Sequence, residues 1–187
     1  MNGPVAYLDN NATTRLDPRV LEAMLPVLAE QYGNPASMHH FGAQVGALVE
    51  EARDQVARLL GARDSEIIFT SGGTEADNAA LRGVLAARPE RRHLIISAIE
   101  HPAISEPAAE LARAGYRVTT VGVDGRGLID LGALADALDD DTALVSVMLV
   151  NNETGVVQPL RQVAELARDR GALVHTDAVQ AIGKLPG

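Results

Sequence analysis

Residues 65–87 read "SEIIFTSGGTEADNAALRGVLAA", an apolar run, then small residues, then a helix-forming segment. A strand that passes through a short turn into a helix is the unit from which parallel α/β sheets are built. Gly72 and Gly73 let the backbone approach a ligand closely, and the first amides of the following helix lack partners within that helix. Such a turn favours a phosphate. The alternative is an ordinary strand-to-helix turn in which Thr70 or Ser71 caps the helix.

Further short runs rich in branched apolar residues occur along the chain and alternate with segments of helical periodicity. This alternation predicts an α/β fold with a mostly parallel sheet flanked by helices. The expected strands lie at 66–69, 93–97, 116–121, 143–149 and 172–176.

The predicted helices have recognisable ends. A long helix is expected from Ser37 to Leu60, where apolar residues recur every three or four positions and Gly61 follows the last of them. Other start and stop signals stand at Asp17 with Pro18, at Asp130, and at Pro159 with Gly171.

The composition excludes several classes of protein. A chain of 187 residues with 47% hydrophobic and 22% charged residues is typical of one globular domain. The net charge of −9 and the scattered basic residues argue against a nucleic-acid partner. The absence of cysteine excludes disulfides, zinc–thiolate sites and a catalytic thiol within this chain, and we predict no metal site. No signal-peptide pattern or membrane-length apolar run is present, so we expect a cytoplasmic protein without a membrane partner.

Polar residues follow four of the expected strands, and in a parallel α/β sheet ligands bind outside the carboxyl ends of the strands. Together these residues supply a phosphate cradle, an imidazole, amides and a carboxylate. They are Thr70 to Thr74, Glu100 to Pro102, Asn151 to Glu153, and Thr176 to Gln180.

Each of these groups also has a structural interpretation. A histidine before Pro102 is typical of a helix terminus, Asp177 is a possible helix cap, and the asparagines are typical of a turn. Their joint occurrence favours a flat, phosphorylated heteroaromatic cofactor, and pyridoxal 5′-phosphate fits that description. Nicotinamide nucleotides and nucleoside triphosphates fit worse, because their glycine-rich fingerprints are missing.

Six motifs in order carry a resemblance to a known family. The chain resembles the cysteine desulfurases of the class V aminotransferase family, which are pyridoxal-phosphate enzymes of fold type I. The motifs are "YLDNNATT" (7–14), "GNPAS" (33–37), "IFTSGGTEADN" (68–78), "EHPA" (100–103), "VNNETGVVQP" (150–159) and "HTDAVQAIGKLP" (175–186).

The resemblance implies a role for each matching residue. Gly73 and Thr74 are expected to hold the cofactor phosphate. His101 is expected to stack on the pyridine ring and to move protons as the catalytic residue, and Asp177 to pair with the ring nitrogen. Contacts to the phenolic oxygen side are implied for Asn152 and Gln180.

The resemblance also implies residues that this chain does not contain. The family's cofactor-binding lysine lies in a Ser-x-His-Lys stretch beyond the position of Asp177, and Lys184 does not match it. The mobile thiol that accepts sulfur is likewise missing. We therefore expect an N-terminal half that is inactive alone, with residues 1–14 associated with the small domain and residues 15–187 in the cofactor-binding large domain.

The implied activity is conversion of L-cysteine to L-alanine with transfer of sulfur to an acceptor thiol, for iron–sulfur cluster or thio-cofactor assembly. The expected partners are L-cysteine, a sulfur-acceptor or scaffold protein and, in the complete enzyme, a second copy in a homodimer. The alternatives are another class V enzyme, such as a selenocysteine lyase or an aminotransferase, and a non-catalytic interaction fragment.

Overall fold

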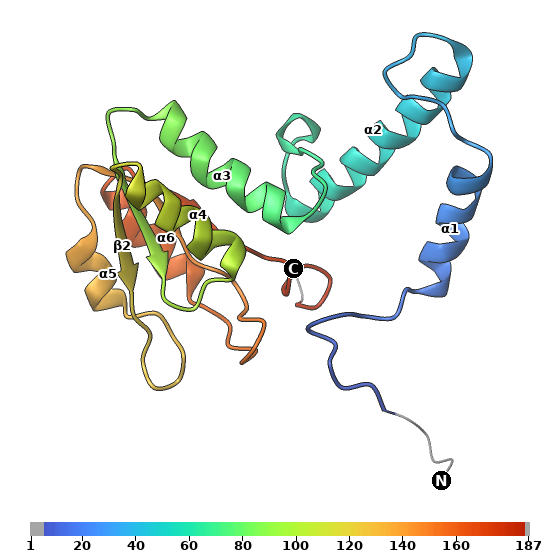
Figure 1. Ribbon diagram of the computed structural model, residues 1–187. Helices are drawn as coiled ribbons and strands as arrows, with labels where there is room; N and C mark the ends of the chain where they lie inside the picture. Colours follow the sequence, from blue (N-terminus) through green and yellow to red (C-terminus); the bar gives the residue numbers. More distant parts are fainter. Residues whose placement is uncertain (1–5, 186–187) are drawn as a thin grey trace. The chain divides into compact units, whose positions relative to one another are not determined.

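The computed structural model describes residues 6–185 (Figure 1). Backbone contacts divide the chain into two compact units, one ending at Phe69 and the other beginning at Thr70. The boundary expected after residue 14 stays a prediction, and residues 1–5 of that segment lie outside the described residues. Within residues 6–185, no helix has the length and apolar character needed to cross a membrane.

The first unit contains α1 (Pro18–Ala29) and α2 (His40–Leu60). The start predicted for α1 is confirmed, because the Asp17 side chain accepts a hydrogen bond from the Arg19 amide at 2.8 Å. Helix α2 begins three residues later than expected, since the ring of His39 caps it. It ends as predicted at Gly61, whose φ of 64° lies in the left-handed region that favours glycine.

The strand predicted at 66–69 is wrong. A short 3-10 helix, η1 (Asp64–Glu66), leads into an extended segment that pairs with no other strand among residues 6–185. The carbonyl of Ile67 accepts a hydrogen bond from the Arg53 guanidinium, and Ile68 is 82% exposed. Strand-like composition is insufficient here because a strand also needs a neighbour for its backbone groups.

The second unit is a four-stranded parallel sheet in the order β2-β1-β3-β4, with helices on both faces. This confirms the predicted α/β class and four of the five expected strands, some shorter than predicted. Asp130 caps its helix as predicted. The elements are α3 (Gly73–Ala87), β1 (His93–Ser97), α4 (Pro102–Arg113), β2 (Arg117–Val121), α5 (Leu131–Ala137), β3 (Thr142–Ser146), α6 (Leu160–Asp169) and β4 (Leu173–His175).

Alternating strand residues build two hydrophobic layers. Leu94 and Leu144 pack with α3 and α4 on one face of the sheet, whereas Ile95 and Val145 pack with α5 and α6 on the other (Figure 1). All four side chains are at most 1% exposed. This two-sided burial explains why the strands read as continuous apolar runs.

The strand order positions the functional edge. From β1 the chain adds β2 on one side and then crosses to add β3 and β4 on the other side. The order of the strands therefore reverses between β1 and β3. In open parallel sheets the crevice for a ligand lies at this reversal, outside the carboxyl ends of the strands.

A fully buried histidine lies at the opposite, amino edge of the sheet. His93 begins β1, and its Nδ1 and Nε2 atoms lie 2.9 and 2.8 Å from the hydroxyls of Thr142 and Thr119. Burial lowers the pKa of His93, with a further contribution from the charge of Arg117. The folded chain therefore favours the neutral imidazole.

We expect His93 to make the free energy of unfolding depend on pH. Because its pKa is lower in the folded chain than the ordinary 6.5, the unfolded chain takes up the proton first, and stability is lost as pH falls below that value. Urea unfolding at pH 7.5 and 5.5 should show a smaller acid loss in His93→Gln than in the parent. The control is His40→Gln, which removes an exposed imidazole. Equal acid losses in parent and His93→Gln would contradict this assignment.

Candidate active site

The turn before α3 leaves the first amides of the helix without a side-chain cap from the described residues. Gly72 occupies the capping position. The Thr70 hydroxyl donates to the Gly72 carbonyl at 3.0 Å, and the Ser71 hydroxyl donates to the Glu75 carboxylate at 2.6 Å. The alternative that Thr70 or Ser71 caps the helix is therefore wrong, and the turn retains the amide geometry that favours an anion.

The same turn lies against the segment that follows β4. A Cβ atom placed on Gly73 would lie only 3.2 Å from Cγ2 of Val179. The Val179 amide donates to Oδ1 of Asp177 at 2.9 Å, and the Leu149 amide donates to the Asp177 carbonyl at 2.9 Å. These contacts bring together the start of α3, Asp177 and the end of β3.

His101 caps α4, as its structural interpretation predicted. Its Nδ1 atom accepts a hydrogen bond from the Ala103 amide at 3.1 Å, so in the neutral ring the proton lies on Nε2. The ring nevertheless reaches the surface and lines a pocket of about 340 Å³ together with Thr74 and Asn78. A capping histidine and a residue that faces a ligand are therefore compatible here.

The asparagines after β3 divide into two roles. Asn151 is buried, and its Oδ1 atom accepts hydrogen bonds from the amides of Glu153 and Thr154, so it holds a turn. Asn152 is half-buried in the same turn, and Gln180 is half-buried after β4. The assignments of Asn152 and Gln180 to the phenolic oxygen stay predictions.

Asp77 is an acidic residue whose role the sequence did not indicate. It lies on α3, is 5% exposed, and has its Oδ1 atom 3.5 Å from Nε2 of His175. The pKa of Asp77 is raised to about 6, mainly by burial and secondly by the charge of Asp177, while His101 acts to lower it. Asp177 and His101 thus both lie within electrostatic reach of one buried carboxyl group.

Glu100 is a second buried carboxyl group, and it connects the ends of β1 and β3 across the reversal. Its Oε1 atom accepts hydrogen bonds from the Ser97 hydroxyl at 2.5 Å and from the Met148 amide at 2.8 Å. Burial raises the pKa of Glu100 to about 7, against the effect of these two hydrogen bonds. Oε2 is buried and has no hydrogen-bond partner in the described part of the chain.

The residues present fit pyridoxal 5′-phosphate. The uncapped amides of α3 suit its phosphate, and a side chain at position 73 would press against Val179. The Asp177 carboxylate suits a protonated ring nitrogen. The Thr176 hydroxyl is buried without a hydrogen-bond partner among residues 6–185, as expected of a polar group beside a ligand. No cluster of metal-ligating side chains occurs in the same residues.

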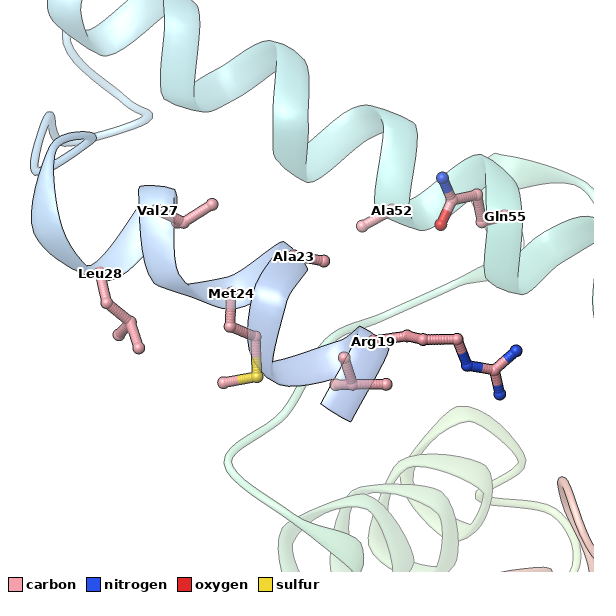
Figure 2. A pocket seen from close by; sticks show the side chains of 8 residues that line it. Arg19, Ala23, Met24, Val27, Leu28, Ala52 and Gln55 are labelled. Atoms are coloured by element: carbon pink, nitrogen blue, oxygen red, sulfur yellow. The ribbon is translucent and has the colours of Figure 1, made fainter. Parts of the chain in front are cut away.

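A larger groove in the first unit is lined mostly by apolar side chains. It has a volume of about 710 Å³ and lies between α1 and α2 (Figure 2). Its lining includes no carboxylate or imidazole. The lining residues are Arg19, Val20, Ala23, Met24, Val27, Leu28, Ala52 and Gln55.

Comparison with known proteins gives consistent matches over nearly the whole chain. The model of the aminotransferase class-V family matches residues 6–187. Cysteine desulfurase 2 of Trichormus variabilis is 59% identical over 182 residues, which cover 97% of this chain and 46% of the relative. The cysteine desulfurase NifS of Azotobacter vinelandii is 52% identical over 181 residues, covering 96% of this chain and 45% of the relative. The chain thus spans about half the length of these relatives.

Solved structures show the same similarity. A NifS-like protein superposes with a TM-score of 0.92 at 45% identity, covering 95% of this chain and 50% of that protein. SspA in complex with cysteine superposes with a TM-score of 0.90 at 34% identity, covering 95% of this chain and 51% of that protein. The fold is that of NifS-like enzymes.

Glu100→Gln should stabilise the chain at alkaline pH. The Gln side chain keeps the Oε1 acceptor, but it cannot become a buried anion. Because the pKa of Glu100 is raised from 4.5 to about 7, its protonated form adds at most about 3 kcal/mol to the free energy of unfolding. This contribution is complete below pH 4.5 and is lost as pH rises through 7. Urea unfolding should show the variant more stable than the parent at pH 8, with the difference shrinking towards pH 5.

Glu75→Gln is the matched control. Hydrogen bonds from Ser71 lower the pKa of Glu75, so this exposed carboxylate favours the folded state and its replacement should bring no gain at pH 8. If Glu100→Gln showed the same stability difference at both pH values, Glu100 would not be the buried acid described here.

Proposed function

Because the chain belongs to the aminotransferase class-V family, we propose that it is the N-terminal, pyridoxal-phosphate-binding half of a cysteine desulfurase. The observation that carries the proposal is the convergence of the α3 turn, His101 and Asp177 at the carboxyl edge of the sheet. The relatives named cysteine desulfurase support the substrate class. The proposed overall reaction converts L-cysteine to L-alanine and passes sulfur to an acceptor thiol.

Two groups of this chain would hold the ends of the cofactor. The first amides of α3 and the Thr74 hydroxyl would bind the phosphate, helped by the positive end of the helix dipole. The Asp177 carboxylate would accept a hydrogen bond from the protonated ring nitrogen. The hydrogen bond from the Val179 amide fixes the orientation of this carboxylate. When bound, pyridoxal phosphate supplies a ring that withdraws electrons from the substrate α-carbon.

His101 and two amide side chains would complete the contacts. The Ala103 amide fixes the His101 ring through Nδ1, which leaves the Nε2 proton for exchange with bound substrate and one face of the ring for stacking. Asn152 and Gln180 would donate to the phenolic oxygen of the cofactor. These roles follow the family resemblance.

The remaining steps need groups that this sequence lacks. A lysine that binds the cofactor covalently and a thiol that takes up sulfur would come from further polypeptide. The similarity to SspA, which was solved with cysteine, supports L-cysteine as the substrate. A sulfur-acceptor or scaffold protein, a homodimer and a cytoplasmic location complete the proposal.

Borohydride trapping should locate the missing lysine. With this chain alone, pyridoxal phosphate should bind weakly and keep the spectrum of the free aldehyde, and borohydride should leave Lys184 unlabelled. Adding a polypeptide that carries the Ser-x-His-Lys segment should allow trapping on that lysine, because the site holds the aldehyde beside the amine at high effective concentration. Mass spectrometry identifies the labelled residue. Stoichiometric labelling of Lys184 in the isolated chain would contradict the proposal that the lysine lies elsewhere.

Asp177→Asn in the reconstituted enzyme should retain part of its cofactor affinity but lose turnover by roughly two orders of magnitude, because a neutral amide cannot stabilise the protonated ring nitrogen. Alanine formation from L-cysteine measures turnover. Asp124→Asn is the matched control, since Oδ1 of Asp124 likewise accepts the amide two residues on, from Arg126 at 2.9 Å. Turnover equal to the parent in Asp177→Asn would make Asp177 a structural turn residue.

A further inference from the structure

Three polar side chains form a continuous chain beneath the candidate site. The Ser146 hydroxyl on β3 lies 2.9 Å from Nδ1 of His175 on β4. Nε2 of the same ring lies 3.5 Å from Oδ1 of Asp77 on α3. Ser146 is fully buried and Asp77 is 5% exposed. The three side chains therefore connect β3 and β4 with α3, the helix that begins at the phosphate turn.

Ser146, His175 and Asp77 are the residue types of a hydrolytic Ser-His-Asp triad, but they cannot act as one. In a triad the serine oxygen attacks the substrate and must be accessible. Ser146 exposes none of its surface. The three side chains must therefore serve the structure or the electrostatics of the neighbouring site.

The protonation state follows from burial and from the two neighbours of the ring. Burial lowers the pKa of His175, so the neutral imidazole is favoured, although the charge of Asp177 opposes this effect. A neutral ring donates from one nitrogen and accepts at the other. The Ser146 hydroxyl can donate to Nδ1, and the Nε2 atom, which then carries the proton, lies 3.5 Å from Oδ1 of Asp77.

The three side chains link two parts of the candidate site. Asp77 lies one helical turn after Gly73 and His175 lies two residues before Asp177. We propose that the Asp77–His175–Ser146 relay is a positioning device, which fixes the phosphate turn of α3 relative to the carboxylate that meets the ring nitrogen. This inference rests on the proposed function.

Charge gives the relay a second effect. Asp77 lies within electrostatic reach of His175, His101, Asp177 and Glu100. Three carboxyl groups therefore influence one another, and one of them is Asp177, which would meet the cationic ring nitrogen. A bound cation relieves their mutual repulsion. Removing the charge of Asp77 should therefore weaken cofactor binding as well as loosen the turn.

Equilibrium dialysis with pyridoxal phosphate tests the relay in the chain itself. Asp77→Asn and His175→Asn should each raise the Kd about tenfold, by analogy with the loss of an outer-shell partner at metal sites. The double variant should raise it by less than the product of the two single effects, because both substitutions break one connection.

His93→Asn is the matched control, because His93 is also a buried strand histidine between hydroxyl groups, but at the amino edge of the same sheet. It should lower stability and leave the Kd unchanged. An unchanged Kd in both relay variants, or an equal rise in His93→Asn, would overturn the relay alone. A parent chain that fails to bind pyridoxal phosphate would overturn the proposed function and this role of the relay with it.

Nitrogen-15 NMR of the histidine rings gives a readout that needs no cofactor. His175 should carry its proton on Nε2, and Asp77→Asn should shift the Nε2 resonance while leaving that of His93 unchanged. A proton on Nδ1 of His175, or an unchanged Nε2 resonance, would show that Asp77 does not accept from the ring and would exclude the relay.

Discussion

The parallel pairing of β1 with both β2 and β3 is the constraint on which the second unit depends. Parallel strands need a crossover between them, so α4 and α5 must pass over the faces of the sheet and every strand ends at the same edge. The polar segments that follow β1, β3 and β4 are consequently neighbours, although about eighty residues separate Glu100 from Gln180 along the chain. Glu100 secures this edge by bonding the end of β1 to the amide of Met148.

Local signals in the sequence predicted most of the elements. Gly61 ends α2, Asp17 and Asp130 cap their helices, and the branched apolar run at 93–97 is a central strand. Each of these outcomes depends on the residue itself or on its near neighbours, which a single sequence displays. The segment 66–69 has the same composition but no strand beside it, and pairing is a property of the whole chain.

The candidate site shows the same division. The places of His101 and Asp177 at the carboxyl edge were predictable, because both residues follow parallel strands in the sequence, whereas the turn before α3 follows no strand and the roles of all three stay predictions. Asp77 lies within α3 and His175 lies within β4, so neither residue follows the end of a strand. Only the packing of α3 against the sheet brings Oδ1 of Asp77 to 3.5 Å from Nε2 of His175. Asp77, Leu81 and Leu85 share the buried face of α3 at helical spacing, but that spacing does not determine which polar group Asp77 meets.

Charge is distributed unevenly across the site, and this matches the proposed cofactor. Pyridoxal phosphate carries an anionic phosphate and, when protonated, a cationic ring nitrogen. The amides at the start of α3 present positive partial charge, whereas Asp77, Asp177 and Glu100 lie within electrostatic reach of one another. Without a cation, burial and mutual repulsion raise the pKa of Asp77 to about 6 and that of Glu100 to about 7. Under the proposed function, the cationic ring nitrogen would reduce the repulsion among these carboxyl groups.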